Sequence, residues 1–334
     1  MENSIYEVLK SKYRIGENYI AAYLSQHFGS SNVSIETFNQ KLTSDPNFSN
    51  WVDYALSTNT RGRTFVNLIR PYLPQDAKRY LDVGSAYGGF PIGFMELGLE
   101  VVGIEHNEKL VQLSRANFKD HGLEDASIKG DILDENVIQS IGKFDVITCI
   151  DVIEHVADVP QAMKNMISLL NPKGILILQM PNKDSISNII TDPHFGVFGL
   201  TLLRHSDARK LYFCYFPHRK IYDVGEFYQQ GYYLSLLQQL DCTAAVLPPV
   251  VATSIRKKAT LIPQYLANLW KFALNTSLTI PAKLRIKVIT LAFHRIIEFN
   301  VGLLLAALFP MQWRSTVKRK FVDDAWFIIG TKRF

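Results

Sequence analysis

A chain of 334 residues is long enough to bury a sizeable core, in one large domain or in two. Its 47% apolar and 20% charged residues are typical of a globular protein and argue against a disordered or low-complexity chain. The net charge of +5 is unevenly spread, because residues 251–323 hold twelve Lys or Arg against two acids, a local +10 that leaves about −5 for the rest.

The first segment, residues 1–75, is expected to be a helical cap. Its apolar residues recur three and four apart, as in Ile5, Val8 and Leu9, and the pattern ends at a turn around Pro71. Charges are scattered through its first twenty residues, so these lack the uninterrupted apolar core of a signal peptide. We therefore expect no export.

From Tyr80 onward the pattern changes, because short β-rich runs alternate with amphipathic helices. The predicted elements are YLDVG, a helix from Pro91, LEVVGIE, a helix over 108–121, SIKGD, FDVITCID, a helix over 159–170, and GILILQMP. Alternation of this kind predicts a parallel sheet covered by helices on both faces. Ligands bind such sheets at the carboxyl ends of the strands.

The stretch LDVGSAYGGF, residues 81–90, places a glycine turn at such a strand end. Its spacing misses the G-x-G-x-x-G dinucleotide fingerprint, because Ala86 stands at the second glycine. Glu105 ends the next predicted strand, where a carboxylate can accept hydrogen bonds from ribose hydroxyls. That requirement is shared by nicotinamide dinucleotides and S-adenosylmethionine. With Asp82 and Asp131 the pocket would be acidic, which suits a cationic sulfonium better than a pyrophosphate.

These motifs, followed by GIEHN, GDI, FDVITCIDVIEHV and LLNPKGILILQMPN, resemble a class I S-adenosylmethionine-dependent methyltransferase. They are most similar to the small-molecule O-methyltransferases of the ubiquinone-biosynthesis type. The resemblance covers about residues 75–182. It implies an α/β fold with a Rossmann-like seven-stranded sheet, mostly parallel with an antiparallel last strand, and S-adenosyl-L-methionine as the cofactor.

The resemblance also implies roles for individual residues. The turn from Gly84 to Gly88 would pass under the methionine part of the cofactor, and Glu105 would hold the ribose. Asp131 and Ile132 would frame the adenine, and the strand end at Asp151 would border the methyl group. The full predicted cofactor set is Asp82, Gly84, Ser85, Gly88, Gly89, Glu105, His106, Asp131, Ile132, Asp151 and Val152. Ala86 departs from the family pattern and places a Cβ beneath the cofactor.

The run Asp151-x-x-Glu154-His155 leaves three interpretations open. These residues could simply begin a helix and orient the substrate loop. His155 could instead be the general base for a hydroxyl nucleophile, since histidine changes charge near neutral pH. A metal site is the third interpretation, with His194 or His218 as the distant ligand, because the pattern resembles the magnesium site of small-RNA 2′-O-methyltransferases. We name His155 and His218 as catalytic candidates and assign no metal ligand.

The acceptor must be recognised by the segment after the fifth strand. Residues 183–223 are rich in Phe, Tyr, His and Arg, and we expect them to form a substrate lid. Aromatic residues more often build a core, so a pocket for anionic or hydroxylated groups is the alternative explanation. Methyl transfer needs in-line positioning and, at oxygen, removal of one proton.

The main departure from the family is an insertion over 251–323, between an expected sixth strand, TAAVLPPV, and a last strand over 325–333. Basic residues flank its apolar runs, which favours amphipathic helices on an anionic membrane surface or over a lipid-like acceptor. A helical subdomain or dimer interface remains open. The run over 282–309 carries charges, and its uninterrupted apolar part is short of the roughly 20 residues of a bilayer span. We expect no span there.

The sequence thus predicts a cap at 1–75, a cofactor-binding core at 76–250 with its lid at 183–223, an insertion at 251–323, and a last strand at 324–334. The expected function is methyl transfer to a small-molecule or lipid-linked acceptor, at a hydroxyl oxygen. The alternatives are a metal-assisted RNA ribose 2′-O-methyltransferase and a catalytically degenerate partner subunit. We expect a cytoplasmic protein with reduced cysteines and peripheral membrane contact through the insertion. A homodimer is left open, and nucleic acid lacks support, because the basic residues form no stripe interleaved with aromatics.

Overall fold

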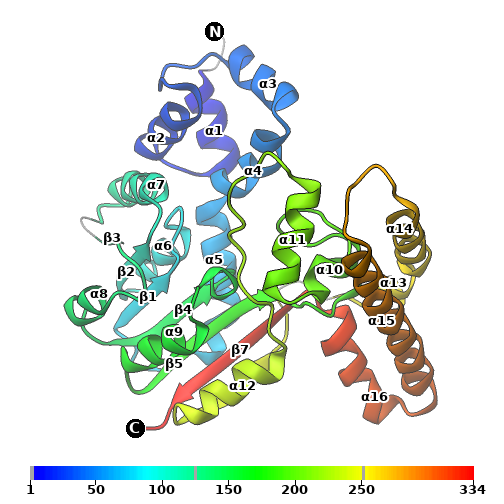
Figure 1. Ribbon diagram of the computed structural model, residues 1–334. Coiled ribbons are helices and arrows are strands. Elements are labelled where there is room, and N and C mark those ends of the chain that lie inside the picture. Colours follow the sequence, from blue (N-terminus) through cyan, green and yellow to red (C-terminus); the bar gives the residue numbers. More distant parts are fainter. Residues whose placement is uncertain (1–3, 124–125, 250–252) are drawn as a thin grey trace. The chain divides into compact units, whose positions relative to one another are not determined.

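The computed structural model describes residues 4–123, 126–249 and 253–334 (Figure 1). The predicted boundary between 250 and 251 lies outside these residues. The chain forms two compact units. The first contains 1–150, 161–177 and 331–334, and the second contains 151–160 and 178–330. The four predicted domain ranges stay predictions.

Seven strands form one sheet in the order β3-β2-β1-β4-β5-β7-β6, mostly parallel with the last strands antiparallel. This confirms the predicted fold class. The strands are β1 (Arg79–Val83), β2 (Glu100–Glu105), β3 (Ser127–Lys129), β4 (Phe144–Ile150), β5 (Leu170–Pro181), β6 (Cys242–Leu247) and β7 (Ala325–Lys332). The fifth strand starts earlier than predicted, since it runs back through Lys173, whose φ is 65°.

Strand β1 is central in the first unit, because it pairs in parallel with β2 on one edge and with β4 on the other. Tyr80 to Val83 are buried, as expected for a strand covered on both faces. Val83 lies in register with Ile104 of β2 and Cys149 of β4. The carboxyl ends of β1 and β2 therefore lie side by side, which brings the glycine turn next to Glu105.

The helices of the first unit begin with the predicted cap. They are α1 (Ile5–Tyr13), α2 (Glu17–Phe28), α3 (Ile35–Ser44), α4 (Pro46–Leu56), α5 (Thr58–Ile69), η1 (Arg70–Tyr72), α6 (Gly89–Met95), α7 (Glu108–Lys119) and α8 (Glu135–Ser140), with most of α9 (Val159–Ser168). Helices α5 and α6 pack backbone to backbone. A Cβ at Gly62 would lie 1.9 Å from the carbonyl oxygen of Gly89, and one at Gly89 would lie 2.2 Å from that of Thr58.

The second unit is mainly helical. It contains η2 (Ile153–His155), α10 (Ile186–Ile190), η3 (Leu200–Leu202), α11 (His205–Tyr215), α12 (Gln230–Gln239), α13 (Ile255–Ala259), α14 (Ile262–Leu274), α15 (Ala282–Leu308), α16 (Pro310–Val317) and η4 (Lys318–Val322). Its core gathers around α15, which buries Val288, Ala292 and Phe299. The ammonium of buried Lys258 lies 2.6 Å from a carboxylate oxygen of Asp324.

Helix α15 (Ala282–Leu308) bears on the expectation that no span lies in this segment. It has 27 residues, and its most apolar window has a mean hydropathy of 1.6 with 28% of the window buried. By length and composition it could cross a membrane, so the expected lack of a span stays a prediction. Length and composition alone are weak evidence for a span, since core helices pass the same test.

Charged side chains tie the middle of α15 to the rest of its unit. Arg295 is largely buried, and its Nη2 lies 2.9 Å from Oδ1 of buried Asp184, which follows β5. The same guanidinium pairs with Glu298, which is also 3.3 Å from the ammonium of Lys320. A buried charge is tolerated when it is paired in this way.

Candidate functional site

The glycine turn between β1 and α6 is built from left-handed backbone. Gly84 and Gly88 have φ values of 77° and 80°, and Ala86 has a φ of 44°. The N–H groups of Gly84 and Ser85 donate to the carbonyl of Ile104, at 2.8 and 3.0 Å. The hydroxyl of Ser85 is buried and has no hydrogen-bond partner in the structure. The turn thus offers one unused polar group.

Glu105 closes this turn from the neighbouring strand. Its side chain is only 4% exposed, and Oε2 accepts from the N–H of Ala86 at 3.1 Å. Oε1 accepts from the N–H of Asn107 at 2.8 Å, and Nδ1 of exposed His106 lies 3.2 Å from it. A carboxylate has about four acceptor positions, so capacity remains for ribose hydroxyls. The carboxylate therefore braces the turn, and its role in ribose binding stays a prediction.

Asp82 lies beneath the turn and is 2% exposed. Its Oδ1 accepts from the hydroxyl of Thr148 at 2.7 Å, and that hydroxyl is also 2.5 Å from the hydroxyl of Tyr80. Burial, with a smaller contribution from the charge of Glu105, raises the pKa of Asp82 to about 7. Asp82 therefore changes charge near neutral pH.

The predicted adenine residues follow β3 in the first unit. Asp131 is exposed, and its Oδ1 accepts from the N–H of Leu133 at 2.9 Å. Ile132 is buried, and its carbonyl accepts from the side chain of Asn165 at 2.8 Å. This places an acid beside an apolar side chain, an arrangement that suits an adenine amine and ring. Their role in adenine binding stays a prediction.

In the second unit, Asp151 has a φ of 54°, which is strained for a residue other than glycine. Its N–H donates to the carbonyl of Gln179 at 2.9 Å, and the Gln179 side chain donates to both oxygens of its carboxylate. Val152 is half-buried. Both belong to the second unit, and their role beside the methyl group stays a prediction.

Three side chains of the second unit converge at Glu154. One ligand atom from each of Glu154, His155 and His194 lies within 4.8 Å of the others. The histidine rings meet edge-on, with centroids 4.9 Å apart. Glu154 is 2% exposed, and neither of its oxygens has a hydrogen-bond partner. Nε2 of His194 is 3.8 Å from Oε1 of Glu154, which is too long for a hydrogen bond.

The surroundings orient the ring of His155 and hold the backbone around His194. Nδ1 of His155 is 2.8 Å from the carbonyl of Asp223, which can only accept, so Nδ1 carries the proton and Nε2 is left as an acceptor. The loop that carries His194 is held by Asp192, whose carboxylate accepts backbone N–H groups from His194, Phe195 and Val197. A buried carboxylate with two imidazoles is a donor set suited to a divalent cation.

His218 is exposed in the segment after α11, and no contact in the structure joins it to His155. Of the two distant histidines considered from the sequence, the structure brings His194 to the Glu154 cluster. The lid aromatics Phe195, Tyr212 and Tyr222 pack on one another, with Phe195 4.5 Å from Tyr212 and 5.5 Å from Tyr222 between ring centroids. These aromatics are largely core in character.

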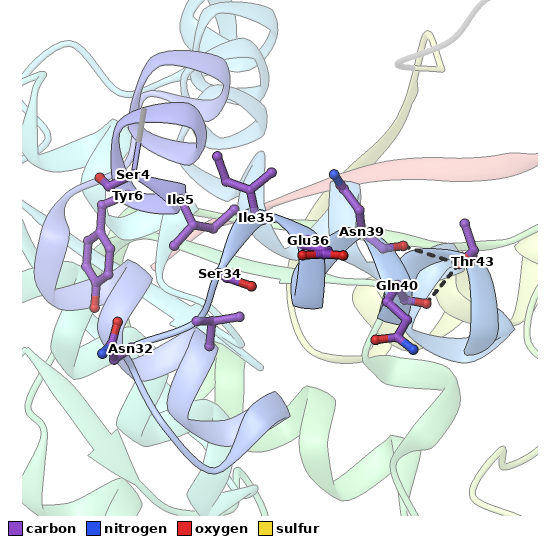
Figure 2. A pocket seen from close by; sticks show the side chains of 11 residues that line it. Ser4, Ile5, Tyr6, Asn32, Ser34, Ile35, Glu36, Asn39, Gln40 and Thr43 are labelled. Carbon is purple, nitrogen blue, oxygen red and sulfur yellow. Dashed lines mark hydrogen bonds between the residues drawn. The ribbon is translucent and has the colours of Figure 1, made fainter. Parts of the chain in front are cut away.

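A pocket of about 1040 Å³ lies between α1, α3 and the segment before α3 (Figure 2). Its lining includes Glu36, Asn39 and Thr43, and the Thr43 hydroxyl donates to the carbonyls of Asn39 and Gln40. It contains none of the predicted site residues. We therefore do not assign the functional site to this pocket.

Sequence reasoning missed the residues that support the site. Thr148 and Tyr80 hydrogen-bond around Asp82, and both lie inside strands that read only as buried apolar runs. Asn117 donates to the carbonyl of Tyr87 at 2.8 Å in the turn, from the predicted helix after β2. The one signal that the sequence offered for these supporting residues was Thr148, a polar residue in an otherwise apolar strand.

Comparison with known proteins gives one family. A model described as "Methyltransferase domain" matches residues 54–245. The ubiquinone biosynthesis O-methyltransferase of Xanthomonas axonopodis pv. citri (strain 306) is 30% identical over 31% of this chain and 44% of its own length. That of Caulobacter sp. (strain K31) is 27% identical over 33% of this chain and 43% of its own length. The matches thus span less than half of these relatives.

Two solved structures resemble the fold. A SAM-dependent methyltransferase from Archaeoglobus fulgidus is 13% identical, with a TM-score of 0.47 and coverage of 86% of this chain and 100% of its own. A putative sarcosine dimethylglycine methyltransferase from Galdieria sulphuraria is 13% identical, with a TM-score of 0.40 and coverage of 83% of this chain and 84% of its own. The predicted resemblance is confirmed by the family match.

Proposed function

Because the chain belongs to the methyltransferase domain family, we propose that it transfers a methyl group from S-adenosylmethionine to a hydroxyl oxygen of a small-molecule or lipid-linked acceptor. Membership makes the chain an S-adenosylmethionine-dependent enzyme. The acceptor class and the oxygen are the proposal. The turn closed by Glu105, with the unused hydroxyl of Ser85 beside it, supports cofactor binding. The observation that supports a hydroxyl acceptor is Nε2 of His155, which can accept its proton.

S-adenosylmethionine supplies an activated methyl group on a cationic sulfur, so this chain's residues need only bind, align and remove one proton. The carboxylate of Glu105 favours a cationic ligand, and so does Asp82 when it has lost its proton. We assign proton removal to His155, since its protonated Nδ1 leaves Nε2 free to accept. His218 remains a candidate without a contact that supports it.

One observation favours a second candidate, metal-assisted methyl transfer. Glu154, His155 and His194 form a cluster in which the buried carboxylate of Glu154 lacks any hydrogen-bond donor among the described residues. If a divalent cation occupies it, Nε2 of His155 is a ligand and cannot also be the base. The acceptor hydroxyl would then lose its proton beside the cation. This supports metal assistance without favouring RNA over a small molecule as the acceptor.

The test is calorimetric titration of the full chain with S-adenosylmethionine, S-adenosylhomocysteine and NAD, each with and without a divalent cation. Binding of the two adenosyl ligands alone is expected. Binding of NAD instead would overturn the proposal, and binding of none would point to a degenerate subunit. Cation-dependent turnover of a hydroxylated acceptor would favour the metal-assisted form, whereas turnover in chelator would favour His155 as the base.

We further propose that the enzyme acts in the cytoplasm. The three cysteines, which lie outside any C-x-x-C spacing, support this location. Fractionation of cells that produce the tagged chain would test it. Recovery in the exported fraction would contradict the proposal.

A further inference from the structure

Helix α15 carries apolar side chains on two opposite faces. One face packs in the core of the second unit, as described above. The other is exposed along its whole length, where six side chains are between 46% and 63% exposed: Ile286, Phe293, Ile297, Val301, Leu304 and Leu308. They recur at steps of three, four or seven residues, so they form one line on the helix.

The exposed line continues on the neighbouring helices. On α14, Leu266, Trp270 and Leu274 are spaced four apart and are 47%, 68% and 59% exposed. This helix lies beside α15 (Figure 1). The hydroxyl of Tyr265 on α14 donates to the carbonyl of Ala292 on α15 at 2.7 Å. After α15, Met311 is 97% exposed. We call the exposed apolar residues between Leu266 and Trp313 the apolar surface.

An apolar surface of this extent marks an interaction site, because soluble monomers rarely expose large contiguous apolar patches. Most of the large, exposed apolar side chains in the described part of the chain belong to it. The remainder, such as Val8 and Ile221, are scattered over other elements. Single exposed residues of that kind are ordinary, whereas a line along a helix of 27 residues is not.

Basic side chains flank both ends of the apolar surface. Lys271 and Lys283 are exposed where α14 ends and α15 begins, and Arg314 and Arg319 are exposed after α15. Among the described residues none of these four forms an ion pair, whereas Lys287 pairs with Asp207 at 2.7 Å. The unpaired charges are thus of one sign, and they attract an anionic partner.

We propose that the apolar surface docks on a lipid bilayer that contains anionic lipid, with α15 lying in the plane of the interface. Exposed Trp270 and Trp313 fit the headgroup boundary, where an indole ring is both apolar and polar. The basic ends would contact lipid phosphates. This inference goes beyond the proposed methyl transfer and does not depend on it.

Two other occupants fit less well. A bilayer span would strip the opposite face of α15 from its core and would take the Arg295–Asp184 ion pair into hydrocarbon. A second copy of the chain would bring equally basic ends together, since a symmetric interface pairs the same surface with itself. Anionic lipid complements both the apolar line and its flanks.

The first experiment is flotation of the full chain with vesicles of phosphatidylcholine alone or mixed with phosphatidylglycerol. We expect binding to the anionic vesicles only, weakened by salt. The double variant Phe293→Ser, Leu304→Ser should lose about tenfold or more in partitioning. The control, Val8→Ser with Ile221→Ser, removes exposed apolar groups elsewhere and should bind as the unchanged chain does. Circular dichroism should show both variants folded.

The second experiment distinguishes binding through the basic residues that flank the apolar surface from binding through the net charge of the chain. The triple variant Lys271→Gln, Lys283→Gln, Arg314→Gln should bind anionic vesicles more weakly. A matched triple of exposed lysines on the first unit, Lys119→Gln, Lys164→Gln, Lys173→Gln, changes the net charge equally and should not. Equal losses would mean general charge attraction and would overturn the assignment.

Light scattering in the absence of lipid tests whether a second copy of the chain occupies the apolar surface instead. A dimer that dissociates in the Phe293→Ser, Leu304→Ser variant, together with no vesicle binding, would make the apolar surface an interface between copies and would overturn the proposal. No S-adenosylmethionine is present in these assays. Failure of vesicle binding and failure of cofactor binding are therefore separate results.

Discussion

Glu105 of the first unit and Glu154 of the second are both buried carboxylates near the end of a parallel strand, with 4% and 2% exposure. Glu105 accepts two backbone N–H groups, whereas neither oxygen of Glu154 has a hydrogen-bond partner. A buried carboxylate satisfied by its own chain organises a loop. One left unsatisfied is costly, so it marks a place where a ligand supplies the missing partner.

Asp82 is the residue that most strongly tests this comparison, because it is buried and accepts a hydrogen bond from a side chain, that of Thr148, and none from the backbone is seen among the described residues. Its folded-state pKa of about 7 lies above the usual value near 3.9, so the folded chain holds a proton that the unfolded chain has lost. Its contribution to stability is therefore fully present below about pH 4 and is lost as the pH rises to about 7. Above about pH 7 the contribution of Asp82 to the free energy of unfolding no longer changes with pH.

The variant Asp82→Asn mimics the protonated side chain and should remove this dependence. We expect the unfolding free energy of the unchanged chain to fall relative to the variant by roughly 4 kcal/mol between pH 4 and pH 8. Urea unfolding at several pH values, without cofactor, measures it. A difference that does not vary with pH would show that Asp82 is ionised throughout.

The next largest effect on stability is expected from cation binding at Glu154. If its cluster binds a divalent cation, the cation at a hundredfold excess over its dissociation constant should stabilise the chain by about 2.7 kcal/mol. Because two imidazoles take part, Zn²⁺ and Mn²⁺ should act more strongly than Mg²⁺. Thermal unfolding with each cation measures this. The stabilisation should vanish in Glu154→Gln, and a gain that persists there would place the cation elsewhere.

The variant Glu105→Gln tests the other carboxylate of the comparison, the one whose oxygens accept backbone N–H groups. The amide keeps one acceptor for the turn but loses the charge and the second acceptor, so affinity for S-adenosylmethionine should fall roughly tenfold or more. Calorimetry measures the affinity, and thermal unfolding checks the fold. Glu100→Gln, an exposed carboxylate at the other end of β2, is the matched control. Unchanged affinity in Glu105→Gln would remove its assignment to the ribose.

The smallest effect is expected at Ala86, in the turn that Glu105 braces. Its φ of 44° costs an alanine about 1 kcal/mol that a glycine avoids, so Ala86→Gly should stabilise the chain by about that amount. Gly88→Ala should do the opposite, because its φ is 80° and the new Cβ would lie 2.6 Å from the ring of Phe118. Chemical denaturation measures both.

Local patterns were enough for most elements. The helix beginning at Glu108 and the last strand beginning at Ala325 were predicted from periodicity, and both are present with small shifts at their ends. Contacts between distant segments were not predictable. Gly62 gives no sign in sequence that it meets Gly89, and the sequence could not decide between His194 and His218 as the partner of Glu154. Such choices depend on how the loops fold back.

The ion pair of Arg295 with Asp184 joins the middle of α15 to the residues directly after β5, at the start of the predicted lid. Because this ion pair holds α15 at its centre, a force on the outer face of the helix would be transmitted to the residues after β5. If α15 rests on lipid, adsorption would stiffen the segment expected to recognise the acceptor.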